Sequence, residues 1–164
     1  AEKLYTIARD FAELKPDETL LDLYCGTGTI GLTMADSVKR LYGVEIIPQA
    51  IEDAKINAEI NNIKNAEFFC GDASLAAEKL AQQGIKADCI IIDPPRKGCD
   101  STLINTISEK FSPPRVIYIS CDPATLARDL KIFNELGYSA FKVIPVDLFP
   151  RTGHVETVCL LSRK

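Results

Sequence analysis

The sequence lacks any apolar run of the roughly 18 residues that a membrane-spanning helix needs. No apolar segment follows the charged start, AEKLY, so we expect no secretory signal peptide. Six cysteines occur without a Cys-x-x-Cys spacing, which argues against a zinc or iron–sulfur site within this chain. We therefore expect no bound metal, free thiols and a location in the cytoplasm.

An excess of positive charge is also missing. Lys and Arg number 19 against 23 Asp and Glu, and the net charge of −4 has the wrong sign for a domain that binds nucleic acid unaided. The 46% hydrophobic and 26% charged content is typical of an ordinary globular protein. The length of 164 residues predicts a single domain, residues 1–164. Because the chain does not start with Met, we expect this domain to come from a longer protein. We expect it to be a monomer.

Apolar runs alternate with helical patterns along most of the chain. Expected strands are 19–24, 40–46, 66–72, 87–95 and 116–119. Expected helices are 2–14, 30–38, a segment opened by Pro48, 73–83, about 101–111 and a segment after residue 122. Two extended runs, 138–149 and 154–163, joined by a turn at 150–153, indicate an antiparallel hairpin. The fold class is therefore α/β, a doubly wound, mostly parallel seven-stranded sheet of Rossmann-like type with a C-terminal antiparallel hairpin.

A glycine-rich turn follows the first strand. Gly26, Gly28 and Gly31 in YCGTGTIG fit the G-x-G-x-x-G pattern that lets a backbone approach a nucleotide-like cofactor. At the next two strand ends, Glu45 is placed to bind both hydroxyls of a ribose, and Asp72 is either an acceptor for an adenine amino group or a solvated acid. This pattern leaves open both a dinucleotide, as in an NAD(P)-dependent oxidoreductase, and S-adenosylmethionine.

A stiff loop follows the fourth strand. In IIIDPPRKG, Asp93 precedes Pro94 and Pro95, which have no backbone donors and restrict the loop geometry. Such a loop suits the holding of a flat ring against a methyl donor, or it is a structural turn. Arg96 and Lys97 add positive charge at its rim, useful against phosphate but equally suited to solvent.

Cysteine 121 lies at the tip of the fifth strand, just before a helix. A thiolate is a strong nucleophile, and the first helical turn lowers a thiol's pKa, so Cys121 is either a nucleophile or an apolar-acting thiol. His154 and Glu156, two apart on an expected strand, point the same way. Glu156 suits removal of a carbon-bound proton better than activation of a thiol, because like charges oppose each other.

Two rival interpretations involve the same residues. A cysteine hydrolase would pair Cys121 with His154, the only histidine, but would not need the glycine motif. His-x-Glu also begins the zinc deaminase signature, but no P-C-x-x-C follows it, so this reading is rejected. Three further cysteines lie inside apolar runs and are expected to be core residues: Cys70, Cys89 and Cys159.

Four motifs, in order, carry a resemblance to a known family: LLDLYCGTGTIGL, IIIDPPRKG, ISCDPATLARDL and HVETVCLL. Together they resemble the RNA uracil-5-methyltransferases, which form 5-methyluridine in transfer or ribosomal RNA, and the match covers essentially the whole chain. The resemblance implies a class I methyltransferase fold, S-adenosyl-L-methionine as cofactor and RNA as partner, with 23S ribosomal RNA favoured over transfer RNA. The runner-up functions are an NAD(P)-dependent oxidoreductase and a cofactor-binding piece without activity by itself.

The same resemblance implies roles for individual residues. Cys121 corresponds to the nucleophile that attacks C6 of uracil, and Glu156 to the base that removes the C5 proton. The family's cofactor contacts fall on Tyr24, Glu45 and Asp93, whereas Thr29 stands where some members have asparagine. The expected cofactor-binding residues are thus Tyr24, Gly26, Gly28, Thr29, Glu45, Asp72 and Asp93.

The family's other parts are not matched. A glutamine that the family places just before the first helix is missing, as are the N-terminal RNA-binding module and a central insertion that sometimes holds an iron–sulfur cluster. The acidic balance fits this absence, and we expect the chain alone to bind RNA weakly.

Overall fold

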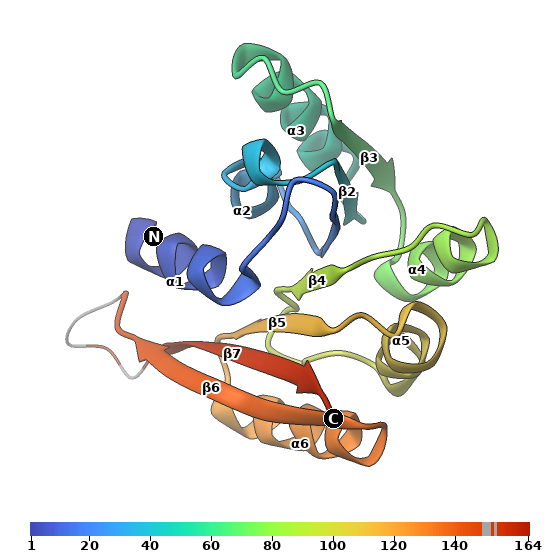
Figure 1. Ribbon diagram of the computed structural model, residues 1–164. Helices are drawn as coiled ribbons and strands as arrows, with labels where there is room; N and C mark the ends of the chain where they lie inside the picture. Colours follow the sequence, from blue (N-terminus) through green and yellow to red (C-terminus); the bar gives the residue numbers. More distant parts are fainter. Residues whose placement is uncertain (149–151, 153) are drawn as a thin grey trace.

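Seven strands form one sheet in the order β3-β2-β1-β4-β5-β7-β6 in the computed structural model, which describes residues 1–148, 152 and 154–164 (Figure 1). The strands are β1 (Thr19–Leu23), β2 (Arg40–Glu45), β3 (Ala66–Cys70), β4 (Cys89–Ile92), β5 (Arg115–Ser120), β6 (Tyr138–Val146) and β7 (Glu156–Arg163). The first five pair in parallel, and β7 pairs antiparallel with both β5 and β6. The predicted fold class is confirmed.

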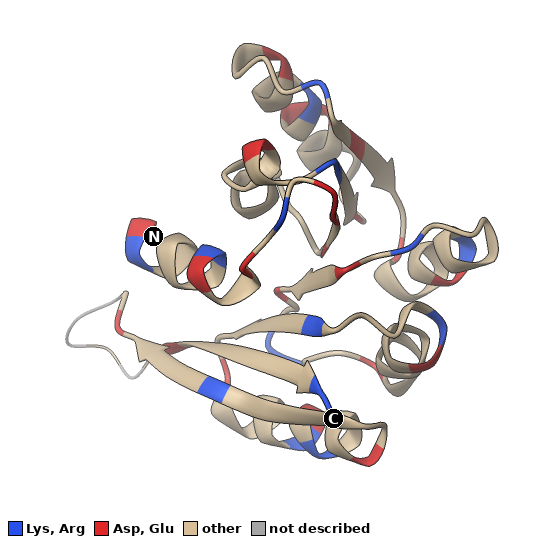
Figure 2. Ribbon diagram, viewed as in Figure 1, with Lys and Arg blue, Asp and Glu red and all other residues tan. Residues whose placement is uncertain are grey.

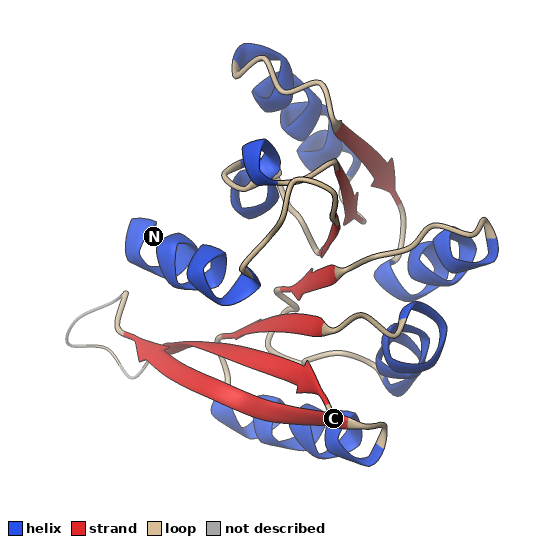
Figure 3. Cartoon of the chain, in the orientation of Figure 1, coloured by secondary structure: helices blue, strands red, loops and turns tan. Residues whose placement is uncertain are grey.

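Helices cover both faces of this sheet (Figure 3). They are α1 (Glu2–Ala12), α2 (Thr29–Leu32), the 3-10 turn η1 (Ala35–Ser37), α3 (Pro48–Ile60), α4 (Ala73–Gln82), α5 (Ser101–Asn105), the π-helical turn η2 (Thr106–Phe111) and α6 (Pro123–Glu135). Among the described residues, no helix is both long and apolar enough to cross a membrane.

The central strands send alternate side chains into two apolar cores. Leu20 and Ile91 pack with residues of α1 and α2 on one face. Leu21 and Ile90 pack with residues of α4, α5 and α6 on the other. Because successive residues of a strand point to opposite faces, a strand covered on both sides is predominantly apolar. This explains the continuous apolar runs of the sequence.

Several expected elements differ in extent from the observed ones. The helix expected over 30–38 is interrupted, because the hydroxyl of Thr33 bonds to the Ile30 carbonyl at 2.7 Å and the chain tightens into η1. The fourth strand covers 89–92 rather than 87–95, since the two prolines after Asp93 cannot donate to a ladder. The helix expected near 101–111 is α-helical only to Asn105 and then widens into η2.

Two further expectations were wrong in part. Cys70 is exposed, because β3 is an edge strand that neighbouring elements cover incompletely, whereas Cys89 and Cys159 are buried as predicted. The hairpin forms, but β7 begins at Glu156, so His154 precedes the strand instead of sharing it. Most of the turn predicted at 150–153 lies outside the described residues.

Candidate active site

The carboxyl ends of the parallel strands meet at one edge of the sheet and surround a cavity of about 350 Å³. Four of the predicted residues line it: Tyr24 after β1, Glu45 at the end of β2, Asp72 after β3 and Asp93 after β4. Ile46, Ile47, Pro95, Lys97, Gly98 and Asp100 complete much of the wall. Residues from four strand ends are thus brought to a single site.

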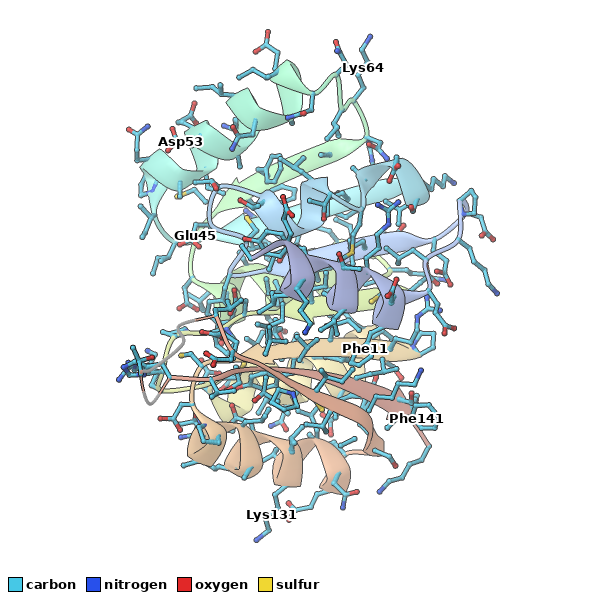
Figure 4. All side chains as sticks on the ribbon, turned by 90° about the vertical axis from the view of Figure 1, so that its left-hand side faces the viewer. Phe11, Glu45, Asp53, Lys64, Lys131 and Phe141 are labelled. Atoms are coloured by element: carbon cyan, nitrogen blue, oxygen red, sulfur yellow. The ribbon has the colours of Figure 1, made fainter. Side chains whose placement is uncertain are left out.

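Glu45 braces the glycine-rich loop. Its Oε2 accepts a hydrogen bond from the amide of Gly26 at 3.0 Å, and its Oε1 accepts one from the amide of Ile47 at 3.0 Å. Gly26 and Tyr24 both have positive φ, 55° and 62°, so the chain turns sharply as it leaves β1. Figure 4 labels Glu45 within the all-side-chain view of this edge. The carboxylate therefore shapes the loop as well as the cavity.

The remaining residues of the loop face elsewhere. A side chain built on Gly28 would come within 3.3 Å of Ala54 and Phe68, so this glycine permits close packing against α3 and β3. Thr29 lies in a separate hollow with Asn57 and Asn61, and its hydroxyl is 3.1 Å from that of Thr27. The structure does not bring Gly28 or Thr29 to the wall of the cavity.

Asp72 has a structural role that is visible in the fold. It is the N-cap of α4, and its Oδ1 accepts from the amide of Leu75 at 3.1 Å. Carboxylate caps of this kind satisfy amides that the helix itself cannot pair. The same side chain lines the cavity, so both uses of the residue are geometrically compatible.

One buried acid beneath the loop escaped the sequence reasoning. Asp22 is 2% exposed, and its Oδ2 accepts from the amide of Gly31 at 3.0 Å. Burial, together with the charge of Asp93, raises the pKa of Asp22 to about 8. A signal existed, since TLLDLY places an acid inside an apolar strand. Gly31 is also required sterically, because a Cβ there would lie 2.8 Å from Asp22 Oδ2.

Cys121, Glu156 and Asp93 gather beside the cavity. Ser120 and Thr157 are register partners in β5 and β7, which places Cys121, just after β5, opposite Glu156, the first residue of β7. Burial raises the pKa of Glu156, although the nearby His154 opposes the shift. Burial and then the charge of Glu156 raise the pKa of Asp93 to about 7. The charge of Glu156 therefore acts on Asp93 across the strand ends.

The predicted lowering of the Cys121 pKa was wrong. Burial first, and then the charge of Glu156, raise the pKa of this half-buried thiol, although Arg96 opposes them. Cys121 also lies one residue before the N-cap of α6 rather than in its first turn. The N-cap is Asp122, whose Oδ1 accepts hydrogen bonds from the amides of Ala124 at 2.9 Å and Thr125 at 3.0 Å. A carboxylate therefore occupies the position where a thiolate would be stabilised. The resting group is a thiol.

The histidine does not pair with the cysteine. His154 Nδ1 lies 3.2 Å from Arg96 Nη2, and this is the side-chain partner that the described structure gives it. A cysteine hydrolase would need the imidazole beside the sulfur to accept its proton. The geometry therefore gives no support to that alternative.

Comparison with known proteins decides the class. The family described as tRNA (uracil-5-)-methyltransferase matches residues 1–164. The chain belongs to this family. An RNA methyltransferase of Clostridium acetobutylicum, named as uncharacterised, is 52% identical over 162 residues, which are 99% of this chain and 35% of that protein. One from Listeria innocua, also named as uncharacterised, is 52% identical over 163 residues, 99% of this chain and 36% of that protein. The chain thus spans about a third of these relatives.

Solved structures agree with the family assignment. The tRNA (uracil-54, C5)-methyltransferase of Pyrococcus abyssi, crystallised with S-adenosyl-L-homocysteine, is 33% identical with a TM-score of 0.77, over 95% of this chain and 37% of that one. A precorrin-6y C5,15-methyltransferase of Geobacter metallireducens, 12% identical with a TM-score of 0.80 over 98% and 88% of the two chains, shows the fold alone. These findings confirm the predicted family and fold, and they indicate S-adenosylmethionine as the cofactor.

The cavity fits that cofactor chemically. Its wall includes four acids, Glu45, Asp72, Asp93 and Asp100, against a single cation, Lys97. Such a lining suits a ligand with a sulfonium cation and ribose hydroxyls better than the doubly negative pyrophosphate of a dinucleotide. Ile46 and Ile47 are 61% and 56% exposed beside it, unusually high for isoleucine, and provide apolar surface for a flat ring.

Proposed function

We propose that the protein to which this chain belongs transfers a methyl group from S-adenosylmethionine to C5 of a uridine in RNA. Cys121 is the nucleophile and Glu156 the base in this proposal. The observation that carries it is the meeting of Cys121, Glu156 and Asp93 at neighbouring strand ends, beside a cavity that suits the methyl donor. Family membership supports the same reaction.

The first step makes C5 of the uracil ring reactive. Cys121 Sγ, as the thiolate, forms a bond to C6, and the electrons of the C5–C6 double bond move toward C5 and O4. Because the pKa of the thiol is raised in the free protein, deprotonation needs help once RNA is bound. The charge of Arg96 favours the thiolate and already offsets part of this rise in the free protein. S-adenosylmethionine, when bound, supplies the electrophilic methyl group that C5 receives.

Glu156 completes the reaction. After methylation C5 still carries its proton, and the Glu156 carboxylate removes it. The electrons of the C–H bond then re-form the double bond, the C6–sulfur bond breaks, and Cys121 leaves as a thiolate. General base catalysis of this kind contributes roughly 10²–10⁴-fold to a rate. The raised pKa of Glu156 makes it a stronger base than an exposed carboxylate.

Some of the expected cofactor-binding residues would contact the cofactor directly, and others would act only through the surrounding structure. Tyr24, Glu45, Asp72 and Asp93 line the cavity, and the Gly26 amide is fixed by Glu45 at its margin. Gly28 supports the site indirectly through packing, and Thr29 through its place at the start of α2.

The substrate we propose first is ribosomal RNA, 23S in particular. We also propose that the enzyme is monomeric and located in the cytoplasm. Transfer RNA is the alternative, since the family's description and the archaeal relative both name it. Acidic and basic residues are interspersed over the helices and loops (Figure 2), and the net charge is −4. Parts of the full-length protein outside this chain would therefore supply most RNA affinity.

The test uses the full-length protein with 23S ribosomal and transfer RNA transcripts and methyl-labelled cofactor. Cys121→Ala should abolish methylation, because C5 never becomes nucleophilic. Glu156→Gln should permit attack and methylation but not elimination, so a labelled protein–RNA complex should survive denaturing electrophoresis. Cys70→Ser, which changes an exposed cysteine on β3, should behave like the unaltered protein. Normal turnover by Glu156→Gln, or a complex formed by Cys121→Ala, would contradict the assigned roles.

A further inference from the structure

The loop after β4, residues 93–100, is fastened to α6 by two adjacent side chains, Arg128 and Asp129. Neither contacts the candidate catalytic groups in the described structure, and the sequence motif that contains them, ISCDPATLARDL, assigned them no role. Both side chains nevertheless bond to the backbone of the loop that carries Asp93. The pair forms a clamp, a term used below for Arg128 and Asp129 together.

Asp129 is fully buried, and both of its carboxylate oxygens accept hydrogen bonds. Its Oδ2 accepts from the amide of Cys99 at 2.8 Å and from the hydroxyl of Tyr118 at 2.6 Å. Its Oδ1 accepts from Arg128 Nε at 2.9 Å. A buried carboxylate is tolerated only with such partners, so its geometry is tightly specified. One side chain thereby joins the loop, the strand β5 and the helix α6.

Arg128 bonds to the loop from the outside. Its Nη2 donates to the carbonyl of Lys97 at 2.7 Å and to that of Cys99 at 3.4 Å. Between these residues lies Gly98, with φ of +75° and an amide that closes a turn on Pro95 O at 2.8 Å. A Cβ on Gly98 would lie 2.5 Å from Asp129 Oδ2 and 2.6 Å from Arg128 Nη2. The loop backbone therefore runs directly against the clamp.

The clamp links the two halves of the candidate active site. Pro95, Lys97 and Gly98 form part of the cofactor cavity. Helix α6, which carries the clamp, begins two residues after Cys121. We propose that Arg128 and Asp129 are positioning residues. They hold the cavity wall and Asp93 at a fixed position relative to the nucleophile, Cys121. This inference rests on the proposed methyl transfer, and it assigns the pair no contact with the substrate.

The size of the effect follows from how steeply group transfer depends on geometry. A displacement of about 1 Å at the reacting atoms can cost about 100-fold in rate. Loosening the clamp frees the loop that bears Asp93 without removing any reacting group. We therefore expect turnover to fall while affinity for RNA, which depends on other surfaces, stays the same.

The principal experiment compares Arg128→Ala with Lys131→Ala in the full-length protein. Both remove one cation from α6, but Lys131 is exposed and points away from the helix (Figure 4). Arg128→Ala should lower kcat about 10- to 100-fold with an unchanged KM for RNA, and hydrogen exchange should accelerate in residues 93–100 alone. Lys131→Ala should match the unaltered protein in both measurements. Arg128→Lys, which keeps one donor for the loop carbonyls, should recover part of kcat.

A second pair of variants tests the loop side of the contact. Gly98→Ala and Gly84→Ala carry the same backbone penalty, since both glycines have φ near +75°, at +75° and +79°. Only the first places a methyl group against the clamp; around Gly84 the space is open. Gly98→Ala should reproduce the loss of kcat and the local exchange of Arg128→Ala, and Gly84→Ala should not.

Several outcomes would overturn the inference. Unchanged kcat and loop exchange in Arg128→Ala would reject it. A loss of kcat with a lowered Tm and faster exchange throughout the chain would also reject it, because the pair would then only stabilise the fold. If the unaltered protein methylates neither RNA, the proposed function fails separately. In that case faster exchange confined to 93–100 with weaker S-adenosylhomocysteine binding in calorimetry supports the clamp, and unchanged binding rejects it.

Discussion

Asp22 has a carboxyl group near the centre of the sheet, where the ionised form is unfavourable. Burial and the charge of Asp93 raise its pKa from 3.8 to about 8. Between those two pH values the folded chain retains a proton that the unfolded chain has lost. The free energy of unfolding must therefore fall as pH rises, by up to about 1.4 kcal/mol per pH unit from this group. Asp93, with a pKa of about 7, adds a contribution of the same sign.

The perturbation that isolates this effect is Asp22→Asn. Asparagine keeps the shape and an oxygen for the Gly31 amide, but it does not titrate. The decline of stability with pH should therefore become less steep by up to about 1.4 kcal/mol per pH unit. Absolute stability is a poorer criterion, since the new amide brings two donors that need partners in a buried site.

Urea denaturation at several pH values from about 5 to about 8 measures this slope. Asp10→Asn, which removes an exposed carboxylate from α1, controls for the loss of one negative charge. An Asp22→Asn slope equal to that of the unaltered chain would refute the reasoning, because Asp22 would then be ionised in both states. An equal change in both variants would refute it too, since net charge rather than burial would be the cause.

Three other predictions concern cofactor binding, the reactivity of Cys121 and RNA binding. Glu45→Ala should weaken S-adenosylhomocysteine binding by about 1.5–3 kcal/mol in calorimetry, and unchanged affinity would remove Glu45 from the site. Because burial and Glu156 raise the pKa of Cys121, its alkylation by iodoacetamide, followed by peptide mass spectrometry, should keep accelerating above about pH 8.5, the ordinary thiol value; a plateau near neutral pH would contradict the assignment. The isolated chain, with its net charge of −4, should bind a uridine-containing stem-loop poorly at physiological salt, an expectation that nanomolar affinity in a titration would reject.

Much of the fold could be predicted because its signals are local. A glycine that must adopt positive φ, such as Gly26, and a proline that opens a helix, such as Pro48, act on their own backbone. Continuous apolar strands indicate burial on both faces whatever the strand order. The helix expected at 30–38 failed because the Thr33 hydroxyl bonds back to the chain, a competition that periodicity does not reveal.

The candidate site was found from the sequence to the extent that its residues stand at strand ends. Cys121 and Asp93 each follow an apolar run, and parallel strands bring their carboxyl ends to one edge. Glu156 was singled out by its place two residues after His154 and by the family motif, and its role stays a prediction. That Asp72 also caps α4 became visible only with the helix in place.

The sequence by itself determined the order of elements, the glycine-rich turn and the residue types at the strand ends, since each depends on short stretches of chain. The tertiary structure alone decided their electrostatics. Whether Cys121 is a thiol or a thiolate depends on Glu156 and Arg96, which reach it from distant segments, and on burial that no local pattern specifies. The clamp is a similar case, because Arg128 and Asp129 acquire a function only where α6 packs against the loop after β4. Charge interactions and packing act through space, and only the folded chain sets those distances.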